Sequence, residues 1–212
     1  MTINEFIAGF LGASAIEMIA SAAGFICVFL LIRRNIWSWG FGLLQVSLFV
    51  WVFYQNKLYS DALLHVFYIG FQFYGWWNWM HHKDAKSDLI IVRTTGRDIL
   101  LWSAVSLCAA VILGYMMDEY TDASFAYADA FTTATSLVAQ FLLTRRHLLN
   151  WLFWIAVDIV AIVIYFQKGL YPTSLLYVTF LTMCCIGQYS WWKQHKRQIR
   201  ASAPEDANHS LV

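Results

Sequence analysis

The chain has 212 residues, of which 60% are hydrophobic and 13% are charged, and its formal net charge is +1. Soluble domains carry about 25% charged residues, so this composition excludes an ordinary soluble domain. A net charge near zero also gives no indication of a nucleic-acid partner.

Seven apolar runs follow one another along the chain, each close to the roughly 20 residues that cross a hydrocarbon core. In chain order they are 12–32, 36–54, 61–79, 98–116, 126–143, 147–166 and 172–192. The first run lacks the basic flank and the small-residue cleavage site of a signal peptide, so it is expected to remain as a span. The sequence therefore predicts an all-α integral membrane protein with seven transmembrane helices.

The basic residues separate clearly when the connections are assigned alternately to the two membrane faces. One face carries Arg33, Arg34, Lys83, Lys86, Arg93, Arg97, Arg145, Arg146, Lys193, Lys196, Arg197 and Arg200. The other face carries only Lys57 and Lys168. The positive-inside rule then places the N-terminus outside and the C-terminus in the cytoplasm.

An internal repeat relates the first three spans to the last three. The pair Arg33-Arg34 recurs as Arg145-Arg146, and 145 − 33 gives an offset of 112, which we call the repeat offset. The same offset carries Trp39 to Trp151, Gly75 to Gly187 and Trp79 to Trp191. Such identity at one fixed offset, without gaps, indicates an internal duplication.

The fourth span is left over between the two units, so both units have the same orientation in the membrane. This predicts a parallel three-one-three repeat, the topology of SWEET-type sugar transporters. The expected organisation is a first three-helix repeat at 1–79, a cytoplasmic loop and linker helix at 80–125, a second repeat at 126–192, and a polar cytoplasmic tail at 193–212.

Polar side chains inside the spans identify the candidate site. Asn150, Trp154 and Asp158 share one helical face, and Trp151 lies one turn from Trp154. A carboxylate near mid-membrane costs about 2.5–3.5 kcal/mol on insertion scales, which favours a functional role over a structural ion pair. Asp158 is accordingly predicted to neutralise a positive charge on a ligand.

The other candidate binding residues come from spans two, three and seven. Flat aromatic faces stack on planar rings, and amides bind hydroxyl groups. The predicted substrate-binding residues are Gln45, His65, Tyr68, Gln72, Trp76, Asn150, Trp151, Trp154, Asp158 and Tyr177. Together they suit a hydroxylated, cationic heteroaromatic ligand.

Enzyme and cofactor chemistry find no support in the sequence. No H-E-x-x-H or G-x-S-x-G motif occurs, and the mid-membrane acid has no second group for acid–base catalysis. The pair His81-His82 lacks a metal-ligand partner, so neither a metal nor a cofactor is expected. Cys27, Cys108, Cys184 and Cys185 lie in apolar runs and are interpreted as buried small hydrophobes.

The chain resembles the PnuC family of vitamin transporters, whose type members carry nicotinamide riboside. The resemblance lies in 58–59 (LY), 73–79 (FYGWWNW), 150–154 (NWLFW) with Asp158, and 168–171 (KGLY). It implies a homotrimer in the bacterial inner membrane, facilitated diffusion of the vitamin, and alternating access between the repeats. It also implies functional coupling to a cytoplasmic kinase that phosphorylates the imported vitamin.

Alternatives stay open at this point. PnuC-like relatives also carry thiamine or riboflavin, and thiamine would satisfy Asp158 as well as nicotinamide riboside does. A SWEET-like sugar transporter shares the topology, although this chain lacks a Pro-Gln pair. The repeat itself breaks at mid-membrane, where Val46 aligns with Asp158 and Gln72 with Cys184, which is the depth expected for an asymmetric site.

Overall fold

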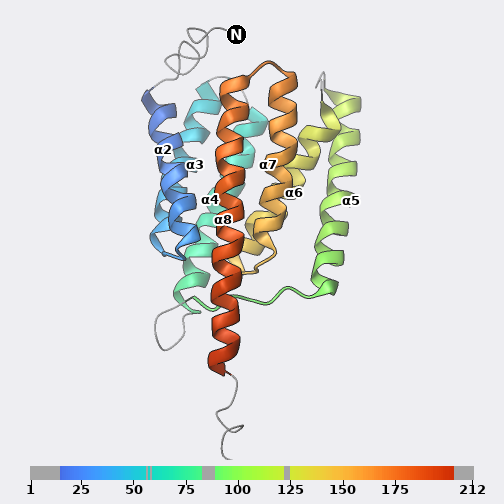
Figure 1. Cartoon of the computed structure of the whole chain (residues 1–212). Helices are drawn as coiled ribbons and strands as arrows, with labels where there is room; N and C mark the ends of the chain where they lie inside the picture. Colours follow the sequence, from blue (N-terminus) through green and yellow to red (C-terminus); the bar gives the residue numbers. More distant parts are fainter. Residues whose placement is uncertain (1–14, 56, 58, 83–88, 122–124, 203–212) are drawn as a thin grey trace, which may run out of the picture.

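The computed structural model describes residues 15–55, 57, 59–82, 89–121 and 125–202. Within these residues the chain forms seven α-helices, and Figure 1 shows them as one elongated bundle. In chain order they are α2 (Ala15–Ile32), α3 (Trp37–Gln55), α4 (Tyr59–Met80), α5 (Gly96–Tyr120), α6 (Ala126–Thr144), α7 (Asn150–Gln167) and α8 (Tyr171–Ser202).

Each predicted apolar run coincides with one of these helices, and most ends agree to within about one turn. The exception is α8, which continues to Ser202 instead of ending at residue 192. The first part of the expected polar tail is therefore helical. Residues 12–14 of the first predicted span and residues 203–212 of the tail lie outside the described residues.

Four of the described helices are long and apolar enough to cross a membrane: α2, α3, α5 and α7. The other three helices, α4, α6 and α8, are more polar. In α6, for example, Thr135, Ser136 and Gln140 are buried among neighbouring helices. Buried polar groups lower the average hydropathy of a helix without exposing it to solvent, so composition alone underrates such a helix.

Helix packing follows the internal repeat. α3 packs between α2 and α4, and α7 packs between α6 and α8. α4 also packs on α6, and α8 packs on α2, so equivalent helices make equivalent contacts across the bundle. Among the described helices α5 packs on α6 alone, and Figure 1 shows it at the edge of the bundle.

The repeat extends to the backbone of the turns. Arg34 and Arg146 both adopt a left-handed conformation, with φ of 58° and 62°. Their amides donate to Leu31 O at 2.9 Å and Leu143 O at 3.0 Å, which closes the last turn of α2 and of α6 in the same way. The two turns thus keep one unusual shape although neither uses glycine.

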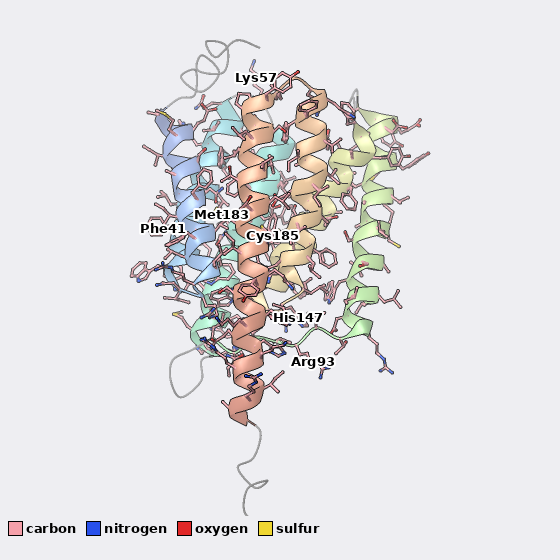
Figure 2. All side chains as sticks on the ribbon, viewed as in Figure 1. Phe41, Lys57, Arg93, His147, Met183 and Cys185 are labelled. Carbon is pink, nitrogen blue, oxygen red and sulfur yellow. The ribbon has the colours of Figure 1, made fainter. Side chains whose placement is uncertain are left out.

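These turns mark one end of the bundle, which we call the arginine end. Figure 2 shows Arg93 and His147 at this end and Lys57 at the other, which we call the lysine end. Left-handed φ values recur there as well, at Lys57 (60°) and Gly169 (72°), which are again related by the repeat offset.

Four tryptophans form the core at the arginine end, and we call them the tryptophan layer: Trp39, Trp79, Trp151 and Trp191. Each is at most 1% exposed. Trp39 meets Trp79 edge-on, with ring centroids 5.1 Å apart, and Trp151 meets Trp191 in the same way at 5.6 Å. The layer therefore contains one edge-to-face pair from each repeat.

Two glycines make room for the tryptophan layer. A side chain at Gly75 would collide with the Trp39 ring, and a Cβ at Gly187 would lie 2.6 Å from the Trp151 ring. Glycine is needed at both positions because an indole ring lies directly on the helix backbone. This explains why Gly75 and Gly187 recur in both halves.

Residues 89–95 cross the arginine end and are held by the turn before α7 and by α8 (Figure 1). Val92 pairs with His147 in a short parallel bridge. The amide of Gln198 accepts from Ile91 N at 3.1 Å and donates to Leu89 O at 2.8 Å. Gln198 lies in the part of α8 that follows the apolar run, so these bonds explain why the helix continues beyond residue 192.

Candidate functional site

Asp158 lies at the middle of α7 and is 4% exposed. Its carboxyl group lies beside the Cys184 thiol of α8. Its Oδ2 atom has no hydrogen-bond partner among the described residues, which also offer it no ion pair. A buried carboxylate oxygen of this kind can accept a hydrogen bond or a positive charge from a ligand.

Two tyrosines extend the polar region from Asp158 toward the lysine end. Tyr177 of α8 lies near Asp158, and its ring stacks on Tyr165 of α7 at 5.3 Å. Tyr68 of α4, which also lies near Tyr177, shares a 2.6 Å hydroxyl contact with Ser136 of α6. The structure thus places Tyr68, Asp158 and Tyr177, three of the predicted binding residues, near one another.

The predicted residue His65 lies in an aromatic triad with Phe53 and Tyr68. Its ring centroid is 4.9 Å from that of Phe53 and 5.6 Å from that of Tyr68. The repeat offset maps this triad onto Tyr165, Tyr177 and Phe180, where Tyr177 again contacts both of its partners. Each repeat therefore contributes one aromatic triad on the lysine-end side of Asp158.

Two predicted amides lie against glycines of the first repeat. Gln45 of α3 packs on Gly24 of α2, where a Cβ would lie 2.6 Å from its Nε2 atom. Gln72 of α4 packs in the same manner on Gly42 of α3. Gln72 is 7% exposed, and its Oε1 atom has no hydrogen-bond partner within the described part of the chain.

The remaining predicted residues lie nearer the arginine end. Asn150 is fully buried and donates to His147 O at 2.7 Å, so its amide closes the turn before α7. Trp151 belongs to the tryptophan layer, and Trp154 packs partly buried against the same core. Trp76 is half-buried beside Trp37, with ring centroids 6.4 Å apart.

The candidate residues lie at three depths along the helices: the tryptophan layer, the mid-depth positions and the aromatic triads. Asp158 lies two turns from Trp151 and two turns from Tyr165, which is about 10 Å of helix in each direction. Gln72 has the same position between His65 and Trp79 of α4. The mid-depth positions therefore lie between the tryptophan layer and the two aromatic triads.

Tyr165 joins this region although the sequence did not single it out. Ser136 and Cys184 also join it, although neither is among the predicted binding residues. Cys184 was interpreted as a buried hydrophobe, and it is buried but contacts Asp158. The same interpretation is wrong for Cys108 and Cys185, which are exposed on the bundle surface. The repeat offset places Cys184 opposite Gln72 at the depth of the site, and it could also have found Tyr165, which corresponds to Phe53.

The described residues contain no group of three histidine, cysteine or acidic side chains that could hold a metal ion. The mid-depth positions and the triads beside them offer one carboxyl group, amides, tyrosine hydroxyls and flat rings, which is chemistry suited to binding a ligand. Apolar membrane-length helices around such a polar interior are typical of a multi-pass membrane transporter.

The sequence model of the nicotinamide mononucleotide transporter family matches residues 14–193, which is most of the chain. The chain belongs to this family of membrane transporters. The resemblance predicted from the sequence is thereby confirmed, and the family's transport role agrees with the absence of enzyme motifs.

Several characterised relatives are similar over most of their length. The nicotinamide riboside transporter PnuC of Escherichia coli is 28% identical over 209 residues, covering 87% of each chain. PnuC of Neisseria mucosa is 30% identical over 196 residues, covering 87% of this chain and 74% of the relative. The riboflavin/roseoflavin transporter RibM of Streptomyces davaonensis is 24% identical over 187 residues, covering 87% of each chain.

A solved structure supports the fold. The crystal structure of the vitamin B3 transporter PnuC superposes with a TM-score of 0.71 at 27% identity. The match covers 92% of this chain and 88% of the other. The arrangement of the described helices is therefore similar to that of a known vitamin transporter.

Proposed function

We propose that this protein imports nicotinamide riboside across the bacterial inner membrane by facilitated diffusion. The observation that carries the proposal is the buried Asp158, which has a free carboxyl oxygen and no ion pair among the described residues. Nicotinamide riboside is a pyridinium cation that carries a ribose, so it would supply the missing positive charge. The names of the PnuC relatives point to the same ligand.

The residues around Asp158 can recognise the rest of this ligand. The rings of Tyr68, Tyr177 and Trp154 can stack on a cationic heteroaromatic ring, which adds a cation–π attraction. Gln45 and Gln72 can exchange hydrogen bonds with ribose hydroxyls and with the carboxamide. We expect His65 and Trp76 to contact the ligand from either side, and Asn150 and Trp151 mainly to support the helices around it.

The transport cycle would use the internal repeat. We assign α2–α4 and α6–α8 to two parallel repeats joined by α5, in a SWEET-like three-one-three arrangement of seven spans. The equivalent contacts of α4 with α6 and of α8 with α2 support this assignment. Alternating access then consists of rocking these two units about the mid-depth site.

The charge distribution supports the orientation. The arginine end faces the cytoplasm in this proposal, with the N-terminus outside and 193–212 on the cytoplasmic side. Net import by facilitated diffusion requires a sink, which a cytoplasmic kinase provides by phosphorylating the vitamin. A homotrimer, with one substrate site in each protomer, completes the proposal.

Uptake into liposomes tests the substrate. Purified protein would be reconstituted, and labelled nicotinamide riboside, thiamine and riboflavin would be offered separately, with and without an internal nicotinamide riboside kinase and ATP. We expect equilibration of nicotinamide riboside alone and accumulation above equilibrium when the kinase is inside. Failure to equilibrate nicotinamide riboside would falsify the proposal.

Riboflavin is the second candidate, because RibM is a relative of similar coverage. Its ring system is neutral, so its transport should not depend on the charge of Asp158. Transport of riboflavin that is unchanged in Asp158→Asn would favour this alternative. Thiamine, which is cationic, would instead share the dependence on Asp158.

A further inference from the structure

The two repeats meet at the arginine end through the tryptophan layer. Trp79 of α4 and Trp191 of α8 contact each other there, with ring centroids 5.8 Å apart. The repeat offset relates these two residues, so their contact joins the same position of the two repeats. All four rings of the layer are buried, so it fills the space between the units at this depth.

Two indole N–H groups join the repeats in a reciprocal way. Trp79 Nε1 donates to Leu143 O of α6 at 3.1 Å, and Trp191 Nε1 donates to Leu31 O of α2 at 2.9 Å. The repeat offset relates the two donors to each other, and it relates the two acceptors as well. Each unit thus donates to the last turn of the first helix of the other unit.

A second reciprocal pair reinforces the first. Asn78 Nδ2 donates to Thr144 O at 2.6 Å, and Ser190 Oγ donates to Ile32 O at 3.2 Å. The side chains differ, but the positions are again related by the repeat offset. Four side-chain-to-carbonyl bonds therefore close the arginine end, and all four cross from one unit to the other.

Among the described residues, the contacts between the units beyond the mid-depth region are of another kind. Tyr68 and Ser136 share one hydroxyl contact, and Phe180 stacks on Phe25 at 4.9 Å. Neither contact fixes a side chain to the backbone of the opposite unit. In this conformation the units are therefore more firmly joined at the arginine end than near the aromatic triads.

We propose that the tryptophan layer is the gate on the arginine side of the site, and that its four reciprocal bonds break together when the gate opens. Because the bonds are related by the repeat, a single rocking of one unit against the other lengthens all of them. Each bond uses a side chain and a backbone carbonyl, so it can break while both helices remain intact. The inference rests on the proposed transport function and specifies which contacts the transport cycle must break.

Cross-linking across the gate tests this proposal in the full-length protein. The exposed Cys108 and Cys185 would be replaced by serine, and Asn78→Cys would be combined with Thr144→Cys. The repeat-equivalent pair is Ile32→Cys with Ser190→Cys. Oxidation, or a short bifunctional thiosulfonate, would link each pair, and mass spectrometry would measure the yield.

We expect each cross-link to reduce nicotinamide riboside uptake at least tenfold, with recovery after reduction. The single-cysteine variants should be insensitive to the oxidant. A matched control pair, Ser106→Cys with Thr135→Cys, joins α5 to α6 at positions whose hydroxyl groups are 2.8 Å apart. The proposal would be overturned if the protein still took up nicotinamide riboside after the gate pairs were cross-linked. It would also be overturned if cross-linking the control pair reduced uptake to the same extent.

A second measurement does not depend on the solute that is carried. Thr144 is fully buried, so a cysteine placed there can react with an impermeant maleimide from the arginine side only when the gate opens. We expect measurable alkylation that slows at least tenfold when Ile32→Cys is linked to Ser190→Cys. If the cysteine at position 144 is not alkylated, or if its alkylation does not slow on cross-linking, the gate is refuted. If alkylation behaves as expected but the vitamin is not taken up, only the proposed substrate is refuted.

Discussion

The tryptophan layer and the mid-depth region lie only a few turns apart, yet the internal repeat is kept in one and lost in the other. In the tryptophan layer the residues, the ring geometry and the cross-unit bonds all recur at the repeat offset. At mid-depth Asp158 corresponds to Val46, and Cys184 corresponds to Gln72. The comparison indicates that packing between the units preserves the symmetry, whereas the region proposed to bind an asymmetric ligand does not keep it.

The largest effect is expected from removing a ring of the tryptophan layer. Trp79→Ala and Trp191→Ala should each lower the free energy of unfolding by about 3–5 kcal/mol, because both rings are buried and bonded across the units. Thermal unfolding in detergent would measure the loss. The neighbouring, exposed Trp77→Ala is the control, and very different losses for Trp79 and Trp191 would break the symmetry of the layer.

The glycines beneath the layer should give the next effect. Gly75→Ala and Gly187→Ala force the Trp39 and Trp151 rings to shift, which should cost up to about 3 kcal/mol of unfolding free energy. Gly70→Ala in α4 meets no atom within 4 Å and should not be destabilising. Unfolding curves of the three variants would test this, and equal stability of all three would contradict the packing described here.

Asp158→Asn tests the asymmetric region. Because the substitution removes the charge and keeps the shape, we expect the affinity for nicotinamide riboside to fall about 10–100-fold, the cost of losing a charged partner. Binding would be measured by calorimetry on purified protein. Asp129→Asn, whose carboxylate pairs with Lys168 at 3.5 Å and is partly exposed, is the matched control and should bind normally.

The smallest effect concerns His147, which corresponds to Asn35 in the first repeat and lies in the turn between α6 and α7. Burial lowers the pKa of His147, although Asp98 acts in the opposite direction. The folded state thus favours the neutral ring, so His147 supports stability above its ordinary pKa of about 6.5, and this support is lost as the pH falls below that value.

His147→Asn restores the residue of the first repeat and should remove this part of the pH dependence. The midpoint of unfolding would be compared between about pH 5.5 and about pH 7.5 for both proteins, which brackets the ordinary pKa of histidine. We expect the parent protein to lose slightly more stability on acidification than the variant. An identical response of the two proteins would show that the turn is insensitive to the charge of His147.

Much of the architecture was predictable from the sequence because its signals are physical and local. A hydrocarbon core requires apolar runs of a certain length, and these runs located all seven described helices. The contacts that the structure shows between α4 and α6 and between α8 and α2 agree with the repeat offset. The offset even marked the paired turns at Arg34 and Arg146, whose backbone conformations agree to within a few degrees.

The mid-depth region was only partly predictable. Asp158 was identified because a carboxylate in an apolar run is costly, but Cys184 and Tyr165 gave no such signal. Trp151 looked like a ring-binding residue by its spacing, whereas its position in the tryptophan layer favours packing and gating. In a helix that is apolar on every side, the sequence does not show which face is buried, so the direction of a tryptophan side chain cannot be predicted.

By itself, the sequence determined the membrane class, the order of the described helices and the identities at the repeat offset, because each depends on composition and spacing along the chain. Only the tertiary structure decided which side chains cross from one unit to the other, as in the bonds from Trp79 to Leu143 and from Trp191 to Leu31. It also decided that α8 continues past its apolar run, where Gln198 holds the segment at Leu89. These contacts join residues that are far apart in the sequence, and they depend on the rotation of each helix about its axis, which apolar runs leave undefined.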